Sequence, residues 1–470
     1  MRIVNSLRTY GDHLAIDPGC HRMAPHPEVW AAMRAEIRRL KEMGETLSPS
    51  MMAAKFGASL APAAGSGIND GRFYDPGKGS ATGGPMRAPA QQQARPLTVG
   101  SKRALVLLVD FDDAPSPLPV QHYRELLFVR AAKPSGPSLR EFFDLASHHR
   151  LDVDGDVVGW LRMPRPLSDY VDNQKGTGRY PKNSQKLAED AIGAALKQGV
   201  KMSQFDVDGD GWVDGLVIVH STPAAETTLD SVEANRRLCS HKWNLRRAQK
   251  SDGVVLYSFT VQSFDSPVGV FCHEFGHLLG LPDLYDTSYL SEGVGDWCLM
   301  GSGAWGGKYK GTQPVDFCAW AKVQLGWIQP TLLKGKAQSL VAKVGDVARV
   351  NHKQGGLEYF LLQARRRVGL DAALPGDGLL IWHIDDHMKN NATPSRYMVG
   401  LEQADGTEDL QNLTNRGDDG DTFPGSKGNS RFDDTSVPNT RTNHQNRQSG
   451  VEVCNIAWGS AGATGTITAP

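Results

Sequence analysis

Two histidines and a glutamate stand at the spacing of a zinc-binding helix within residues 271–286, which read FCHEFGHLLGLPDLYD. His273 and His277 are four residues apart, so on a helix they share a face, one turn apart, and both imidazoles can reach one ion. Glu274 adjoins the first histidine, where its carboxylate can take a proton from a metal-bound water without binding the metal. The spacing predicts a catalytic zinc ion, and the alternative is a buried helix with two hydrogen-bonded histidines.

The residues after this helix supply a candidate for the third zinc ligand. Gly280 can adopt positive φ and end the helix, which turns Asp283 back toward the metal and completes H-E-x-x-H-x-x-G-x-x-D. Asp286 and Glu292 follow closely enough to take the place of Asp283, and the sequence leaves that choice open. A fourth position on the ion would remain for water.

Three further residues are candidates for a place near the metal. Met300 follows the helix in the glycine-rich stretch GDWCLMGSGAW, where a methionine can give the histidine ligands a soft, close-packed floor or can be an ordinary core residue. His220 and His241 lie on or near predicted strands, and either could approach the metal. A lone histidine is more often structural, so neither receives a role.

A second set of candidate ligands lies upstream, in QFDVDGDGWVD at residues 204–214. Aspartates at alternate positions of a turning loop can direct several hard oxygens to one centre, which suits calcium. The loop lacks the glutamate of a complete EF-hand, and the alternative is a solvated acidic turn whose side chains cap backbone donors. The candidate calcium ligands are Asp206, Asp208, Asp210 and Asp214.

Two other polar groups are predicted to be structural. Asp152, Asp154 and Asp156 mimic the start of the calcium pattern, but they lie in a hairpin-like sequence where they favour a turn. His383 and His387 are four residues apart, but the aspartates between them break the H-E-x-x-H pattern.

The composition is that of an ordinary globular protein. The 470 residues carry 51 basic and 52 acidic side chains, so no global charge favours nucleic acid or an anionic membrane as a partner. No stretch approaches the roughly 20 apolar residues of a membrane helix, and the first residues lack the apolar core of a secretory signal. Six scattered cysteines are too few for a disulfide framework.

The order of predicted elements divides the chain into three parts. An amphipathic helix at 27–43 is followed, from 45 to about 101, by a Gly/Pro/Ala-rich linker. Strands, a capped helix after Ser138 and a second helix at 184–199 then indicate a mixed α/β (α+β) catalytic domain. The predicted division is 1–100, a propeptide-like helix plus linker; 101–330, the catalytic domain; and 331–470, an all-β domain of sandwich type.

The zinc helix and its flanking motifs resemble a known family. HEFGHLLGLPD followed by CLMG is similar to the metzincins, and LVLLVDF, DVDGDGWVDGLVIVH, SHKW, WCLMGSGAW and PGDGLLIWHID, in this order, resemble immune inhibitor A-like bacterial zinc metallopeptidases. The resemblance implies a secreted zinc endopeptidase with a propeptide, often with calcium, and a β-rich C-terminal domain. It also implies that His273, His277 and Asp283 bind zinc, that Glu274 is the general base and that Met300 forms the methionine turn.

The function that follows is hydrolysis of internal peptide bonds in protein or peptide substrates, with Tyr285 or Tyr309 as a candidate for stabilising the oxyanion. A rival from another class is a non-catalytic, calcium-stabilised binding or adhesion protein on a degenerate protease fold. A third possibility keeps the zinc but makes the enzyme a narrow exopeptidase. The sequence itself does not show a signal peptide, so export rests on the resemblance.

The N-terminal segment carries a candidate inhibitory residue. Cys20 precedes the first predicted helix, and its thiolate could fill the open zinc position until the linker is cleaved. The alternative is an ordinary surface or buried cysteine.

Overall fold

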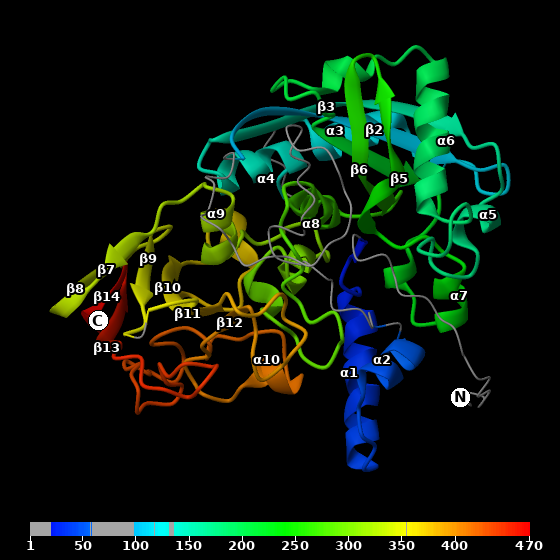
Figure 1. Ribbon diagram of the computed structural model, residues 1–470. Coiled ribbons are helices and arrows are strands. Elements are labelled where there is room, and N and C mark those ends of the chain that lie inside the picture. The colour runs from blue at the N-terminus through cyan, green and yellow to red at the C-terminus, as the bar shows by residue number, and fades with distance from the viewer. Residues whose placement is uncertain (1–19, 57, 59–97, 117, 131–135, 354) are drawn as a thin grey trace.

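The computed structural model describes residues 20–56, 58, 98–116, 118–130, 136–353 and 355–470 (Figure 1). Most of the predicted linker, residues 59–97, lies outside the described residues. Among the helices of the described part, none combines the length and the apolar character needed to cross a bilayer. All six cysteines lie in this part, and none of them forms a disulfide bond among the described residues.

A six-stranded mixed sheet organises the first half of the chain (Figure 1). Its strand order is β1-β5-β6-β4-β2-β3. The strands β2, β3, β4 and β6 run parallel, whereas β5 and β1 pair antiparallel at one edge. This arrangement confirms the predicted mixed α/β architecture. The strands are β1 His21–Arg22, β2 Gly100–Asp110, β3 Leu151–Arg162, β4 Gly215–His220, β5 His241–Ser251 and β6 Val254–Ser263.

Helices cover both faces of this sheet, and β2 shows why its sequence is apolar throughout. Successive side chains of a strand point to opposite faces. Val106 and Leu108 pack on the side of α3, α4 and α8, whereas Leu105 and Leu107 pack on the side of α6. The helices of this part are α3 Val120–Leu127, α4 Leu139–Ala146, α5 Ser168–Val171, α6 Ser184–Lys197, α7 Ser231–Asn235, α8 Val268–Leu278 and α9 Ala319–Gln324.

Two local predictions for this part are confirmed. Ser138 and Glu141 form the capping box of α4, with the Ser138 hydroxyl accepting from the Glu141 amide and the Glu141 carboxylate accepting from the Ser138 amide. The second predicted helix is α6, which is followed by Gly199 with a φ of +84°.

The predicted hairpin at 150–163 is wrong, because these residues form the single continuous strand β3, parallel to β2. The aspartates expected in a turn are on the strand, where Asp152 and Asp154 pair with Arg140. Gly155 is needed for the close packing of β3 against β2. A Cβ there would lie 2.4 Å from the carbonyl oxygen of Ala104.

The N-terminal segment forms two helices beside the zinc-motif region. The predicted helix is confirmed as α1 Pro27–Glu42, and its apolar stripe packs against Tyr285, Tyr289 and Leu413. A second helix, α2 Pro49–Phe56, occupies the start of the predicted linker, so the ordered segment extends further than the composition suggested.

Two further sheets form the C-terminal part, with the orders β12-β11-β10-β9-β7 and β13-β14-β8. They share a hydrophobic core that includes Phe360, Ile381 and Val453. A short helix, α10 Asp409–Asn412, interrupts the expected all-β pattern. The strands are β7 Thr331–Leu333, β8 Gly335–Lys343, β9 Val347–Asn351, β10 Glu358–Arg365, β11 Gly378–Asp385, β12 Val399–Leu401, β13 Glu452–Gly459 and β14 Gly462–Ala469.

The five-stranded sheet is buried on both faces. Along β10, Phe360 and Leu362 face the three-stranded sheet, whereas Tyr359 and Leu361 join the large core that also holds α4 and α8. One continuous core therefore crosses position 330. The predicted domain boundary stays a prediction.

Gly155→Ala tests the close approach of β3 to β2. The added methyl group would meet the backbone of Ala104, which cannot move cheaply, so we expect a loss of about 1–3 kcal/mol in the free energy of unfolding. Chemical denaturation measures this loss.

Gly193→Ala on α6 is the matched control, because a Cβ there meets nothing within 4 Å. Alanine in a helix interior should stabilise by about 0.5–1 kcal/mol. Equal unfolding midpoints for Gly155→Ala and the unchanged protein would contradict the close approach.

Candidate metal centre

Helix α8 carries the motif residues into the core. The helix is buried on all sides, as expected for a segment whose sequence is mostly apolar. Phe271 and Phe275 pack in the large core, and Met300 lies against Gly276, where a Cβ would be 2.7 Å from the Met300 sulfur. Glycine at 276 thus allows the methionine to lie close beneath the helix.

The two histidines are oriented by backbone carbonyl groups. His273 Nδ1 lies 2.9 Å from the Leu299 carbonyl oxygen, and His277 Nδ1 lies 2.7 Å from that of Leu281. A carbonyl can only accept, so each Nδ1 carries the proton and each neutral ring leaves Nε2 unprotonated. Burial lowers the pKa of His277 to about 4, which keeps this ring neutral. Partners of this kind orient metal-binding histidines in many proteins.

Asp283 completes a triangle with the two imidazoles. Gly280 has a φ of +94°, and the chain then returns so that Asp283 Oδ1 lies 3.2 Å from Nε2 of both His273 and His277. The two Nε2 atoms are themselves 3.2 Å apart. A tetrahedral zinc ion with ligands about 2.0 Å away holds those ligands about 3.3 Å apart.

The triangle fits an ion better than it fits hydrogen bonding alone. Neither Nε2 atom has a proton to donate to the other, so their 3.2 Å separation is not a hydrogen bond. The donor set of two imidazoles and a carboxylate is one that zinc accepts.

Glu274 is fully buried and has no hydrogen-bond partner for either carboxylate oxygen among the described residues. Burial raises the pKa of its carboxyl group well above the usual range, and the carboxylates of Asp283 and Glu226 raise it further. A carboxyl group in this state needs a polar partner that the protein side chains do not provide, such as a water molecule at the metal.

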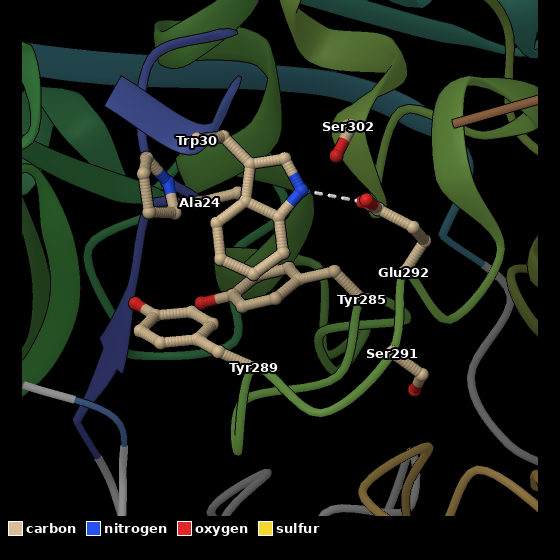
Figure 2. A pocket seen from close by; sticks show the side chains of 8 residues that line it. Ala24, Trp30, Tyr285, Tyr289, Ser291, Glu292 and Ser302 are labelled. Carbon is tan, nitrogen blue, oxygen red and sulfur yellow. Dashed lines mark hydrogen bonds between the residues drawn. The ribbon is translucent and has the colours of Figure 1, made fainter. Parts of the chain in front are cut away.

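The two alternative third ligands have other partners. Asp286 accepts hydrogen bonds from the hydroxyl groups of Ser288 and Ser291. Glu292 accepts from the Trp30 indole at 2.6 Å (Figure 2) and from Arg34 at 2.9 Å. Their geometry favours Asp283 as the residue facing the histidines.

The remaining sequence candidates lie in different settings. Tyr285 is buried and donates to the Arg22 carbonyl oxygen at 2.5 Å, whereas the Tyr309 side chain is largely exposed. His220 bonds to Thr222, and His241 bonds to Ser184 and to the Cys239 carbonyl. Neither histidine belongs to a group of potential metal ligands among the described residues.

The calcium candidates separate into two kinds. Asp206, Asp208 and Asp210 each bring a carboxylate oxygen within 4.8 Å of the others. Asp214 instead accepts from the backbone N–H of Arg103 at 2.9 Å and from the Lys102 ammonium at 3.0 Å. Asp214 also accepts from the backbone N–H of Val207 at 3.1 Å, so it ties the start of β2 to the loop and lies outside the group of three.

The N-terminal segment supplies a residue that the sequence did not single out. His21 Nδ1 lies 3.3 Å from Asp283 Oδ2, and its ring stacks on His277 with the centroids 4.6 Å apart. His21 belongs to β1, which pairs with β5 at the edge of the sheet. Cys20 directly precedes this strand and packs instead with the core on the α6 side.

A small pocket beside the metal centre lies between the N-terminal segment and the loop after the zinc motif. Figure 2 shows Trp30 over the rings of Tyr285 and Tyr289, with its indole nitrogen directed at Glu292. The lining residues are Ala24, Pro25, Trp30, Tyr285, Tyr289, Ser291, Glu292 and Ser302.

Comparison with known proteins decides the family. The profile described as "Immune inhibitor A peptidase M6, catalytic domain" matches residues 92–329, about half of the chain. The chain belongs to the immune inhibitor A family of peptidases. This confirms the resemblance seen in the motifs and makes the protein a member of a metallopeptidase family, whose members hydrolyse peptide bonds.

Curated relatives of this family align over much of the chain. Pre-pro-metalloprotease PrtV of Vibrio cholerae serotype O1 is 28% identical over 389 residues, which cover 71% of this chain and 39% of the relative. Immune inhibitor A of Bacillus thuringiensis subsp. alesti is 29% identical over 289 residues, covering 52% and 42%. The chain thus spans about two fifths of the length of these relatives.

Proposed function

We propose that this protein is a zinc endopeptidase that cleaves internal peptide bonds of proteins. The observation that carries the proposal is the triangle of His273, His277 and Asp283, whose facing atoms are each 3.2 Å apart. These residues would hold the zinc ion, and Glu274 would act as the general base. Family membership supports a protein substrate.

The chemistry divides between the metal and the buried glutamate. When bound, zinc lowers the pKa of a water molecule toward 7 and polarises the scissile carbonyl. Glu274 takes a proton from the attacking water on its carboxylate and delivers it to the leaving nitrogen. Tyr285, which is close to His273, is the better candidate for the oxyanion than the exposed Tyr309.

Glu274→Gln should abolish cleavage while zinc stays bound. The amide keeps the shape of the side chain but cannot accept the proton, and general acid–base catalysis contributes about 10²–10⁴-fold. Casein cleavage and zinc content measured on the same preparation test this. Near-normal cleavage would refute the role of Glu274, and an inactive, zinc-free native protein would favour the rival binding protein.

The same zinc measurement separates the third-ligand candidates. Asp283→Asn should lose zinc, because the amide is a poor ligand for it. Asp286→Asn is the matched control, since Asp286 bonds to serine hydroxyl groups and should leave zinc content unchanged. Zinc loss in Asp286→Asn alone would reverse the assignment. Comparing peptides with blocked and free ends distinguishes the endopeptidase from the exopeptidase.

The edge strand β5 is the proposed binding surface for substrate. An extended peptide can add a strand to a sheet edge through backbone hydrogen bonds. The N-terminal segment already does this, because His21 and Arg22 pair with Lys242 and His241. Its path beside Asp283 and His277 would keep water and substrate from the site, so we propose that the segment holds the enzyme latent.

His21→Ala should activate the full-length protein. The substitution removes the contact with Asp283 and the stack on His277, and a hydrogen bond to a charged group contributes about 1.5–3 kcal/mol. We therefore expect roughly a tenfold or greater rise in cleavage of a fluorogenic peptide before any processing, since about 1.4 kcal/mol is tenfold.

Cys20→Ala is the matched control, because Cys20 packs with the core on the α6 side. Its activity should equal that of the unchanged protein. Activation by Cys20→Ala without activation by His21→Ala would support the thiolate latch instead.

We propose a structural calcium ion in the loop of Asp206, Asp208 and Asp210. Asp206 supports this, because its Oδ1 is buried without a hydrogen-bond partner among the described residues. Lys102 contacts Asp208 and competes with the ion for its charge. Asp214 orders the backbone beside the site.

Calcium should raise the unfolding temperature of the full chain, and Asp206→Asn should remove that rise, because it takes away a charged ligand. Differential scanning calorimetry with and without calcium measures both. Asp154→Asn, a surface carboxylate paired with Arg140, is the control. An unfolding temperature that is the same with and without calcium would refute the site.

The proposal also covers the type of each domain, the role of the N-terminal segment and the location of the protein. The family, the zinc triangle and Met300 beneath α8 support a metzincin-like catalytic domain at 101–330. The two C-terminal sheets and their shared core support a sandwich at 331–470. The segment before residue 101 would act as a propeptide. The name of the PrtV relative, a pre-pro-metalloprotease, supports an extracellular location.

A further inference from the structure

A second group of potential metal ligands lies in the C-terminal sheet. His352 directly follows β9, Glu358 begins β10 and His383 lies on β11, and these three strands are neighbours in the sheet. Each residue brings one ligand atom within 4.8 Å of the other two. Their side chains are almost fully buried, with relative exposures of 2%, 5% and 2%.

The burial of His352 is not explained by hydrogen bonding. Neither of its ring nitrogens has a hydrogen-bond partner in the part of the chain that the structure describes. Buried polar side chains are normally satisfied, so an imidazole with two unpartnered nitrogens calls for a missing ligand. Its ring stands against His383 with the centroids 5.3 Å apart. Burial lowers the pKa of His352 to about 4, which keeps the ring in the neutral form that binds metals.

The other two residues are held as metal ligands are held elsewhere. His383 Nε2 faces Glu358 Oε2 at 3.2 Å, while its Nδ1 lies 2.9 Å from Glu402 Oε1. A carboxylate behind a histidine fixes the ring and its tautomer in many metal sites. Glu358 is fixed in turn, because it accepts from the backbone N–H groups of Asn443 at 2.6 Å and His444 at 3.2 Å.

A purely ionic cluster explains only part of this arrangement. His383 could carry a proton between Glu358 and Glu402, and these carboxylates do raise its pKa to about 9 although burial opposes the shift. That cluster would satisfy His383 and both carboxylates. It would leave both nitrogens of His352 without a partner.

We propose that His352, Glu358 and His383 bind a second divalent metal ion, with zinc as the metal that fits two imidazoles and a carboxylate. Zinc accepts this donor set, and Glu402 would support His383 from behind. The ion would link the strands β10 and β11 to His352 at the end of β9. Glu358 would extend this link to the loop at 443–444 through its two backbone hydrogen bonds. Its role would be to stabilise the C-terminal sheets, independently of peptide cleavage.

Zinc counting in a full-length variant that lacks a catalytic ligand tests the site. His277→Ala removes one ligand of the proposed catalytic centre and should weaken zinc binding there, so the zinc that His352→Gln then removes is assigned to the second site. After dialysis against a low zinc concentration, we expect one zinc ion per chain by mass spectrometry of the metal. Adding His352→Gln should reduce the content to none, with circular dichroism to confirm that the fold is retained.

His220→Gln is the matched control in the same His277→Ala background. His220 is also buried with an unpartnered Nε2, but it belongs to no group of candidate ligands among the described residues. It should leave the zinc content at one.

A folded His277→Ala protein without zinc would overturn the proposal, and so would zinc that persists in the folded double variant. If the double variant does not fold, calorimetry of the His277→Ala protein decides. Added zinc should raise its unfolding temperature, and a constant temperature would refute the site.

Discussion

The proposed catalytic centre depends on two backbone carbonyl groups that fix the protons of two histidines. Because the carbonyls of Leu299 and Leu281 accept from Nδ1, both Nε2 atoms face inward without a proton. Because of this constraint, one face of the buried helix α8 presents two nitrogen atoms that can bind a metal ion. The rest of the fold serves it: Gly276 lets Met300 lie close beneath α8, and Gly280 turns the chain so that Asp283 returns. Burial of three titratable groups at one point is costly without an ion to offset their desolvation.

The edge of the six-stranded sheet joins substrate binding to latency in the proposed mechanism. The strand β5 runs beside the metal centre and offers its backbone groups, and β1 occupies them. In this mechanism a substrate peptide would bind the same backbone groups of β5 that the N-terminal segment occupies. The helix α1 anchors that segment through Trp30 and Arg34, which both bond to Glu292. The loop between Asp283 and Met300 thus contacts both the metal centre and the segment that covers it.

The C-terminal sheets are physically continuous with the catalytic part. Strand β10 places alternate side chains in two different cores, so the five-stranded sheet forms the wall between them. A substitution that alters the packing of this sheet would also alter the packing around α9 and Trp297, because these residues share the large core. The histidine and glutamate cluster lies at the end of the same strands. This position explains how an ion there would stabilise the sheets without touching the peptide-cleaving site.

The sequence by itself determined features whose causes are local. The spacing of His273, Glu274 and His277, the positive φ of Gly280 and the capping box of Ser138 each depend on residues within a few positions, so pattern and propensity suffice. The family followed from motifs of the same kind. Local alternation failed at 150–163, because a hairpin and one long strand look alike until the distant partner β2 is known.

Only the tertiary structure decided which distant residues meet. His21 reaches Asp283 across 262 positions of sequence, whereas its neighbour Cys20 packs with the core on the α6 side. Likewise, His352, Glu358 and His383 come together because β9, β10 and β11 pair side by side. Which strands pair depends on contacts between distant segments throughout the core, so the spacing of residues within one segment does not predict it.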